Sequence, residues 1–208
     1  MAFVKTEVQG AVEIITIDRP KALNALNPEV LADLKAAFEA VDQDAIRCIV
    51  LTGEGDKSFV AGADIGSMST MTKAEGEAFG KLGNDVFLMI EHFPIPVIAA
   101  VNGFALGGGN ELAMSCDIRI CSDNAVYTQE ELMPAALKLA GKIAKNAPIA
   151  VRNCKKAIND GISLPIEKAV EVEEKLFGDC FETHDQVEGM GCFLSREKPK
   201  PKPVFTNN

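Results

Sequence analysis

The 208-residue chain has 21 Lys and Arg against 30 Asp and Glu, a formal net charge of −9, and is 47% hydrophobic. These values are ordinary for a globular protein and suffice for one well-packed domain with a helical appendage. The acidic balance argues against non-specific nucleic-acid binding, no apolar run reaches membrane-spanning length, and the N-terminus lacks a secretory signal. We therefore expect a cytoplasmic protein with neither nucleic acid nor a membrane as partner.

The cysteine and histidine residues point to no metal or disulfide framework. The six cysteines are scattered and form no Cys-x-x-Cys pair. Cys48, Cys116 and Cys121 stand in apolar strand or helix contexts, which predicts reduced core residues. His92 and His184 lie far apart among helix-like residues, so surface or helix-end positions are favoured over metal ligation. We expect no metal and no cofactor.

Residues 1–125 alternate between strand and helix patterns, which predicts an α/β or mixed (α+β) domain. Gln9 and Gly10 separate two strand-like runs as in a hairpin. Asn27 followed by Pro28 is typical of a helix N-terminus. We expect strands at 3–8, 11–18, 47–52, 95–100 and 117–121, helices at 29–41 and 73–92, and a small-residue loop at 57–66.

Residues 126–208 read differently, because no strand signal returns. Residues 128–131 (TQEE) form a capping box. Helical patterns follow at 129–146, 148–160, 165–179 and 184–195. We therefore divide the chain into a core at 1–125 and a C-terminal helical region at 126–208.

The stretch 101–117 (VNGFALGGGNELAMSCD) follows the apolar run expected to form a buried strand at 95–100. It then passes through three glycines into a helical pattern. Such a turn leaves backbone N–H groups unobstructed at a helix N-terminus, where they favour negative charge and can hold an oxyanion. Glu111 stands in the first turn, within reach of a bound substrate. The residues alone support equally well a tight turn whose glutamate only complements the helix dipole.

The motifs together resemble the crotonase (enoyl-CoA hydratase) family. The resemblance rests on 58–65 (SFVAGADI) with 96–117, and on 17–26 (IDRPKALNAL), 146–152 (NAPIAVR) and 183–190 (THDQVEGM). It covers nearly the whole chain and is greatest to the bacterial short-chain members, the 3-hydroxybutyryl-CoA dehydratases. The resemblance implies a ββα spiral core and a C-terminal helical region that makes trimers, with hexamers built as dimers of trimers.

The resemblance also implies roles for individual residues. The backbone N–H groups of Ala63 and Gly108 would form an oxyanion hole around a thioester oxygen, and Glu111 would be one of two catalytic glutamates. The remaining positions would contact the coenzyme A part of the substrate. Ala61, Asp64 and Ile65 would line the adenine and pantetheine path, and Lys21 and Leu23 would flank the CoA moiety. For Lys21, a solvated loop lysine is an equally good interpretation.

The chain departs from the family pattern after Ala125. Family members continue there with a segment that carries the second catalytic glutamate, and here residues 121–125 run directly into 126–131. Either the 208 residues omit an internal segment of the polypeptide, or the polypeptide carries the deletion. The intact motifs on both sides favour the first explanation, since a deletion should expose a sheet edge and apolar surface. Neither Glu130 nor Glu131 can be assumed to replace the second catalytic glutamate, because the capping box already accounts for both residues.

The leading hypothesis is a hydro-lyase of fatty acid or butyrate metabolism that interconverts a trans-2-enoyl-CoA such as crotonyl-CoA with the 3-hydroxyacyl-CoA. CoA is then part of the substrate. One rival is another CoA-ester isomerase, hydrolase or lyase of the same fold, which a panel of acyl-CoA substrates would separate. The other is a catalytically crippled CoA-ester-binding subunit, if the deletion is real. Neither acyl-chain length nor the physiological direction follows from the sequence.

Overall fold

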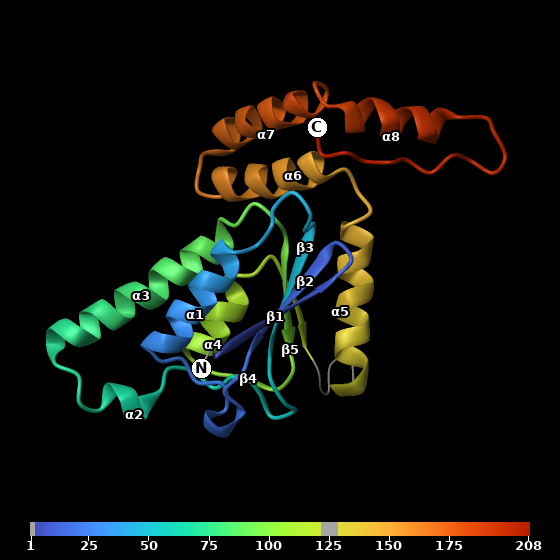
Figure 1. The fold of residues 1–208 in the computed structure, drawn as a ribbon. Coiled ribbons are helices and arrows are strands. Elements are labelled where there is room, and N and C mark those ends of the chain that lie inside the picture. Colours follow the sequence, from blue (N-terminus) through green and yellow to red (C-terminus); the bar gives the residue numbers. More distant parts are fainter. Residues whose placement is uncertain (1–2, 122–128) are drawn as a thin grey trace.

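The computed structural model describes residues 3–121 and 129–208, with a five-stranded sheet at the centre (Figure 1). The strand order is β1-β2-β3-β5-β7. β1 pairs antiparallel with β2, and the other neighbours are parallel. The strands are β1 (Val4–Gln9), β2 (Val12–Ile17), β3 (Cys48–Gly53), β5 (Val97–Val101) and β7 (Ile118–Cys121).

Helices cover both faces of this sheet, so its central strands are apolar on both sides. α1 (Pro28–Glu39), α3 (Lys73–Glu91) and α4 (Gly108–Met114) pack on one face, and α5 (Gln129–Ile143) packs on the other (Figure 1). Successive strand residues point to opposite faces. In β3, Ile49 and Leu51 accordingly join the first core, whereas Cys48 and Val50 pack toward α5.

Most of the predicted elements are confirmed. The hairpin turns at residues 10 and 11, and the side chain of Asn27 caps α1 by accepting a hydrogen bond from the Val30 N–H at 2.9 Å. Helices α5, α6 (Pro148–Gly161), α7 (Ile166–Cys180) and α8 (His184–Leu194) correspond to the four predicted C-terminal helices. The predicted boundary at Ala125 and the capping residue Thr128 lie outside the described residues.

Two predictions were wrong. The stretch 57–66 is not simply a loop, because it contains the short strand β4 (Ser58–Val60) and the one-turn helix α2 (Ile65–Met68), and β4 pairs with β6 (Phe104–Ala105). Cys121 is exposed, whereas Cys48 and Cys116 are buried as expected. Cys121 ends the edge strand β7, whose alternate residues Ile118 and Ile120 are those that pack toward α5.

The last three helices form a separate layer. α6 and α7 lie side by side across one end of the core, and α8 projects beyond them (Figure 1). Lys155 of α6, which is 8% exposed, joins this layer to the sheet through a 2.8 Å ion pair with Asp117. Within the described residues, no helix combines the length and apolarity needed to cross a membrane.

Candidate active site

The small sheet β4–β6 positions the site. Because the two strands are parallel, their carboxyl ends meet at the same edge. The chain leaves β4 into residues 61–65 and leaves β6 into the glycine turn that opens α4. Two backbone segments that are about 45 residues apart in sequence therefore run next to each other.

Glycine is required where these segments touch. A methyl group on the Cα of Gly109 would lie 1.9 Å from the carbonyl oxygen of Val60, so α4 can pack directly on the end of β4 only with glycine there. Gly62 has φ +102, and a methyl group on it would lie 2.9 Å from the carbonyl oxygen of Leu106. Side chains at either position would separate the two segments.

The peptide geometry directs two N–H groups toward one side. The carbonyl oxygen of Gly62 accepts a hydrogen bond from Leu26 N–H at 2.8 Å, and in a trans peptide the next N–H, that of Ala63, points the opposite way. The carbonyl of Gly107 accepts from the N–H groups of Asn110 and Glu111, which orients the Gly108 N–H outward from the helix in the same manner. No hydrogen bond among the described residues uses either N–H group.

The Ala63 nitrogen and one carboxylate oxygen lie close to Gly108. A methyl group on the Cα of Gly108 would lie 3.9 Å from the Ala63 nitrogen and 3.9 Å from Oε2 of Glu111. It would lie 3.6 Å from the Leu26 side chain. Two free N–H donors and a carboxylate beside an apolar contact form a site for a polarised carbonyl group whose neighbouring carbon gains or loses a proton.

The loop at 19–26 is held against this site by buried polar groups whose role the sequence did not reveal. Asn24 is 1% exposed, and its side chain accepts from Arg19 N–H at 3.0 Å and donates to the carbonyl oxygens of Glu54 at 3.0 Å and Ser58 at 2.8 Å. The Arg19 guanidinium donates to the Ala25 carbonyl at 3.1 Å. The available signal was an asparagine four residues after Pro20, in the turn that follows β2.

The residues predicted to contact coenzyme A lie near the carboxyl ends of β4 and β6. Leu23 accepts a hydrogen bond from Ala61 N–H at 3.1 Å, so the loop with Lys21 runs beside residues 61–64. Ile65 is 78% exposed. The carboxylate of Asp64 is already engaged: Arg19, 2.7 Å away, and then the Ser67 N–H hold its pKa below the usual range. CoA contacts by these residues remain predictions.

The surface next to Glu111 is open and partly apolar. A groove of about 500 Å³ runs between α3 and α4, lined by Glu111, Met114 and a face of α3 that includes Glu91. Phe104 is 59% exposed, Leu106 54% and Met114 57%. An exposed apolar surface at a strand edge is what an internal deletion was expected to leave.

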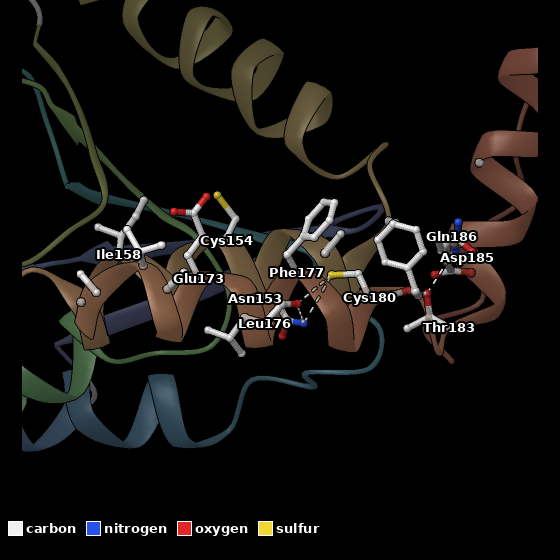
Figure 2. A pocket seen from close by; sticks show the side chains of 18 of the residues that line it. Asn153, Cys154, Ile158, Glu173, Leu176, Phe177, Cys180, Thr183, Asp185 and Gln186 are labelled. Atoms are coloured by element: carbon white, nitrogen blue, oxygen red, sulfur yellow. Dashed lines mark hydrogen bonds between the residues drawn. The ribbon is translucent and has the colours of Figure 1, made fainter. Parts of the chain in front are cut away.

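A larger cavity, of about 900 Å³, lies elsewhere, between α6, α7 and α8 (Figure 2). Its lining is mostly apolar, and one of its polar side chains joins α6 to α7: the Asn153 amide donates to the Leu176 carbonyl at 3.1 Å and contacts Cys180. The cavity contains none of Ala63, Gly108 and Glu111. The candidate site at the carboxyl ends of β4 and β6 is therefore separate from this cavity.

The fold is that of a mixed α/β protein, and its candidate site combines two backbone N–H groups without a hydrogen-bond partner among the described residues and an adjacent carboxylate. The sequence pattern of the enoyl-CoA hydratase/isomerase family matches residues 7–133 and 126–203, so the chain belongs to that family. It is 40% identical to a short-chain-enoyl-CoA hydratase of Clostridium acetobutylicum, over 92% of this chain and 94% of that protein. It is 39% identical to a crotonyl-CoA hydratase of Syntrophomonas wolfei, over 92% and 95%.

Solved structures agree with this assignment. An enoyl-CoA hydratase from Bacillus anthracis superposes with a TM-score of 0.93 at 26% identity, covering 99% of this chain and 100% of that one. A second, from Geobacillus kaustophilus, reaches 0.89 at 30% identity, covering 99% and 98%. The predicted crotonase-like fold is confirmed.

The comparisons also bear on the interrupted family pattern. The alignment with the Clostridium protein spans 246 positions, more than the 208 residues of this chain, so that relative has residues with no counterpart here. The two family matches overlap at residues 126–133. The interruption therefore falls where β7 leads toward α5, next to the predicted break after Ala125.

Proposed function

We propose that this protein is a short-chain enoyl-CoA hydratase, which reversibly adds water to a trans-2-enoyl-CoA such as crotonyl-CoA. The observation that carries the proposal is that the Ala63 nitrogen and the Glu111 carboxylate both lie close to Gly108. The identity of 40% to a short-chain-enoyl-CoA hydratase supports the same reaction class.

The geometry accounts for the chemistry as follows. When water attacks the β-carbon of the enoyl thioester, an electron pair moves onto the thioester oxygen and forms an enolate. The N–H groups of Ala63 and Gly108 stabilise that charge, and such donors each lower the barrier by about 3–4 kcal/mol in comparable sites. Glu111 orients the water and takes its proton, or returns a proton to the α-carbon.

A panel of acyl-CoA thioesters tests the reaction class. We expect loss of the crotonyl-CoA ultraviolet absorbance on hydration, with weaker activity on longer enoyl chains. Hydrolysis of the thioester, or migration of a double bond with no water addition, would instead assign the chain to the isomerase or hydrolase branch of the family.

The second candidate function is a CoA-ester-binding subunit that does not catalyse hydration. The 246-position alignment, which contains relative residues with no counterpart in this chain, favours this function if the polypeptide itself carries the deletion. The mass of the intact chain purified from its natural source separates the two explanations. A mass of 22.2 kDa establishes the deletion, and calorimetry should then show acyl-CoA binding with little hydration. A mass several kilodaltons higher establishes an omitted segment and restores the second glutamate.

The proposal includes a homo-oligomer, a trimer or a dimer of trimers, built through the exposed apolar faces of α6, α7 and α8. The cavity of Figure 2 is lined by these faces, and monomeric proteins rarely leave so much apolar surface uncovered. We propose a cytoplasmic enzyme of fatty acid or butyrate metabolism that needs no metal or redox cofactor, because the addition of water requires only proton transfer and charge stabilisation.

A further inference from the structure

We propose that Asn24 is a positioning residue of the oxyanion hole, acting through Leu26 on the N–H group of Ala63. The inference rests on the proposed function only in taking that N–H as an oxyanion donor. Asn24 itself is buried and faces the loops, so it does not contact the reacting atoms.

The first step of the argument is the way in which Asn24 anchors its loop. Its amide group donates to the carbonyl oxygens of Glu54, which follows β3, and of Ser58, the first residue of β4. Its carbonyl oxygen accepts from Arg19 N–H, which closes the loop on itself. Asn24 adopts φ +58, a left-handed conformation that asparagine tolerates better than most residues.

The second step links this loop to the donor. Leu26 donates its N–H to the Gly62 carbonyl at 2.8 Å and accepts from Asp64 N–H at 2.7 Å. These two bonds hold both peptide groups that flank Ala63. Since Gly62 carbonyl and Ala63 N–H belong to the same planar peptide, rotation of one rotates the other.

The third step concerns what else could hold the donor. Gly62 has φ +102 and no side chain, so the peptide that carries the Ala63 N–H has little intrinsic restraint. Ser58 begins β4, the strand that leads directly into Gly62. Asn24 therefore fixes the loop at 19–26 relative to the start of β4. Leu26, in the same loop, then holds the peptide groups on either side of Ala63, just after the end of β4.

The test measures the oxyanion hole separately from hydration, with acetoacetyl-CoA as probe. The α-proton of this β-ketoacyl thioester leaves to solvent, and the resulting enolate absorbs in the near ultraviolet and places its charge on the thioester oxygen. The wild-type protein should increase the enolate fraction of the bound probe. Asn24→Gly retains the left-handed backbone but removes all three side-chain bonds, and should weaken enolate binding about 10- to 100-fold.

Controls distinguish positioning from general destabilisation. Binding of coenzyme A alone, which has no acyl oxygen, should change less than about twofold in Asn24→Gly. Asn27→Ala, which removes the α1 cap three residues away, should leave the enolate signal unchanged. Asn24→Asp keeps the side-chain volume and the Arg19 contact but turns a carboxylate oxygen toward the Glu54 and Ser58 carbonyl oxygens, so its loss should at least equal that of Asn24→Gly, and it provides a second variant if the glycine variant folds poorly.

The outcomes separate this inference from the proposed function. Full enolate binding by folded Asn24→Asp or Asn24→Gly overturns the positioning role and leaves the oxyanion hole in place. Wild-type protein that binds coenzyme A but gives no enolate signal overturns the hole and the positioning role together. Wild-type protein that gives the signal but does not hydrate crotonyl-CoA overturns the hydratase proposal alone, while loss of the signal in the Asn24 variants still supports positioning.

Discussion

The α/β core and the C-terminal helices α6–α8 bury their apolar residues to very different extents. In the core, α1 buries Val30, Leu31, Leu34 and Phe38, and the central strands β3 and β5 are buried throughout. α7 has the same amphipathic pattern but buries only Leu176, and it leaves Phe177 65% exposed. The helix α1 and the central strands thus bury their apolar residues within the chain, whereas α7 leaves most of its own exposed.

The two regions also differ in the interactions that hold them in place. The site depends on backbone geometry within the core, which hydrogen bonds from neighbouring loops hold in place. The C-terminal layer is joined to the core through polar links that include Lys155 with Asp117, the Asn159 amide with the Glu91 carbonyl and the Arg47 guanidinium with the Phe205 carbonyl. Substitutions in the two regions should therefore separate catalysis, stability and assembly.

The largest effect should come from Glu111→Gln in the core. We expect turnover of crotonyl-CoA to fall about 10²- to 10⁴-fold while CoA-ester binding is kept, because the amide preserves the shape but cannot exchange a proton. Steady-state kinetics and calorimetry measure the two quantities. Glu91→Gln, in the same groove, should cost less than about tenfold. Full activity of the Glu111 variant would remove the carboxylate from the mechanism.

The next effect concerns the link between the regions. Lys155→Met leaves Oδ2 of Asp117 with the Val97 N–H, at 2.7 Å, as its remaining hydrogen-bond donor. Breaking a buried ion pair costs about 3–5 kcal/mol, and we expect about 2–3 kcal/mol of unfolding free energy because the Asp117 side chain is still 25% exposed.

Urea unfolding followed by circular dichroism measures this loss, and the adjacent residue provides the control. Lys156 pairs with Asp160 on the surface, with side chains 60% and 40% exposed. Lys156→Met should change the unfolding free energy by less than about 0.5 kcal/mol. Equal losses in the two variants would show that the layer is not tied to the core through Asp117.

A smaller, pH-dependent effect is expected at the C-terminus. Asp185 is 1% exposed and accepts hydrogen bonds from the N–H groups of Thr206 at 2.7 Å and Asn207 at 3.1 Å. Burial by itself raises the pKa of this carboxyl, but these donors, together with the His184 and Thr206 side chains, outweigh it and hold the pKa below the usual value.

A lowered pKa in the folded state means that the stabilisation is complete above the unfolded-state pKa of about 4 and is lost as the pH falls through the folded-state pKa. The protection of residues 204–208 against hydrogen exchange, relative to the intrinsic exchange rate at each pH, should therefore fall below about pH 4. Asp185→Asn should lose about 1–3 kcal/mol of local stability at neutral pH and abolish this acid-dependent change. An unchanged pH profile in Asp185→Asn would exclude this carboxylate as the titrating group.

Much of this architecture follows from sequence pattern, and the exceptions have physical causes. Helix α1 could be predicted because its cap and its apolar spacing act within one segment. Ala63, Gly108 and Glu111 could be named because their motifs resemble those of a known family. The strands β4 and β6 are three and two residues long, too short for a periodic signal.

The role of Asn24 could not be predicted either, because its bonds reach residues 30 and 34 positions away. Local sequence indicates a turn at such an asparagine and says nothing of which carbonyl groups it will meet. The exposure of Cys121 has the same origin, since only the sheet order places its strand at an edge. Unpredicted features are those that depend on distant segments.

A charge on the exposed face of α7 should have the smallest effect on the stability of the single chain. It is also the most direct test of the difference between the core and helices α6–α8. Phe177 is 65% exposed and lines the cavity between α6, α7 and α8. Phe177→Glu should change the unfolding free energy of a monomer by less than about 0.5 kcal/mol, because the side chain is solvated already. In an oligomer the same charge would be buried without a partner, so association should weaken strongly.

Light scattering coupled to size exclusion measures the mass of the assembly. The matched control is Val8→Glu, which places the same charge on a core-region side chain that is 60% exposed. We expect Phe177→Glu to shift the protein toward monomer and Val8→Glu to leave the assembly intact. A monomeric wild type would refute the proposed oligomer, and an intact Phe177→Glu assembly would place its contacts elsewhere. If only the α7 variant dissociates, the apolar pattern that α1 buries inside the core is completed in α7 by a second chain.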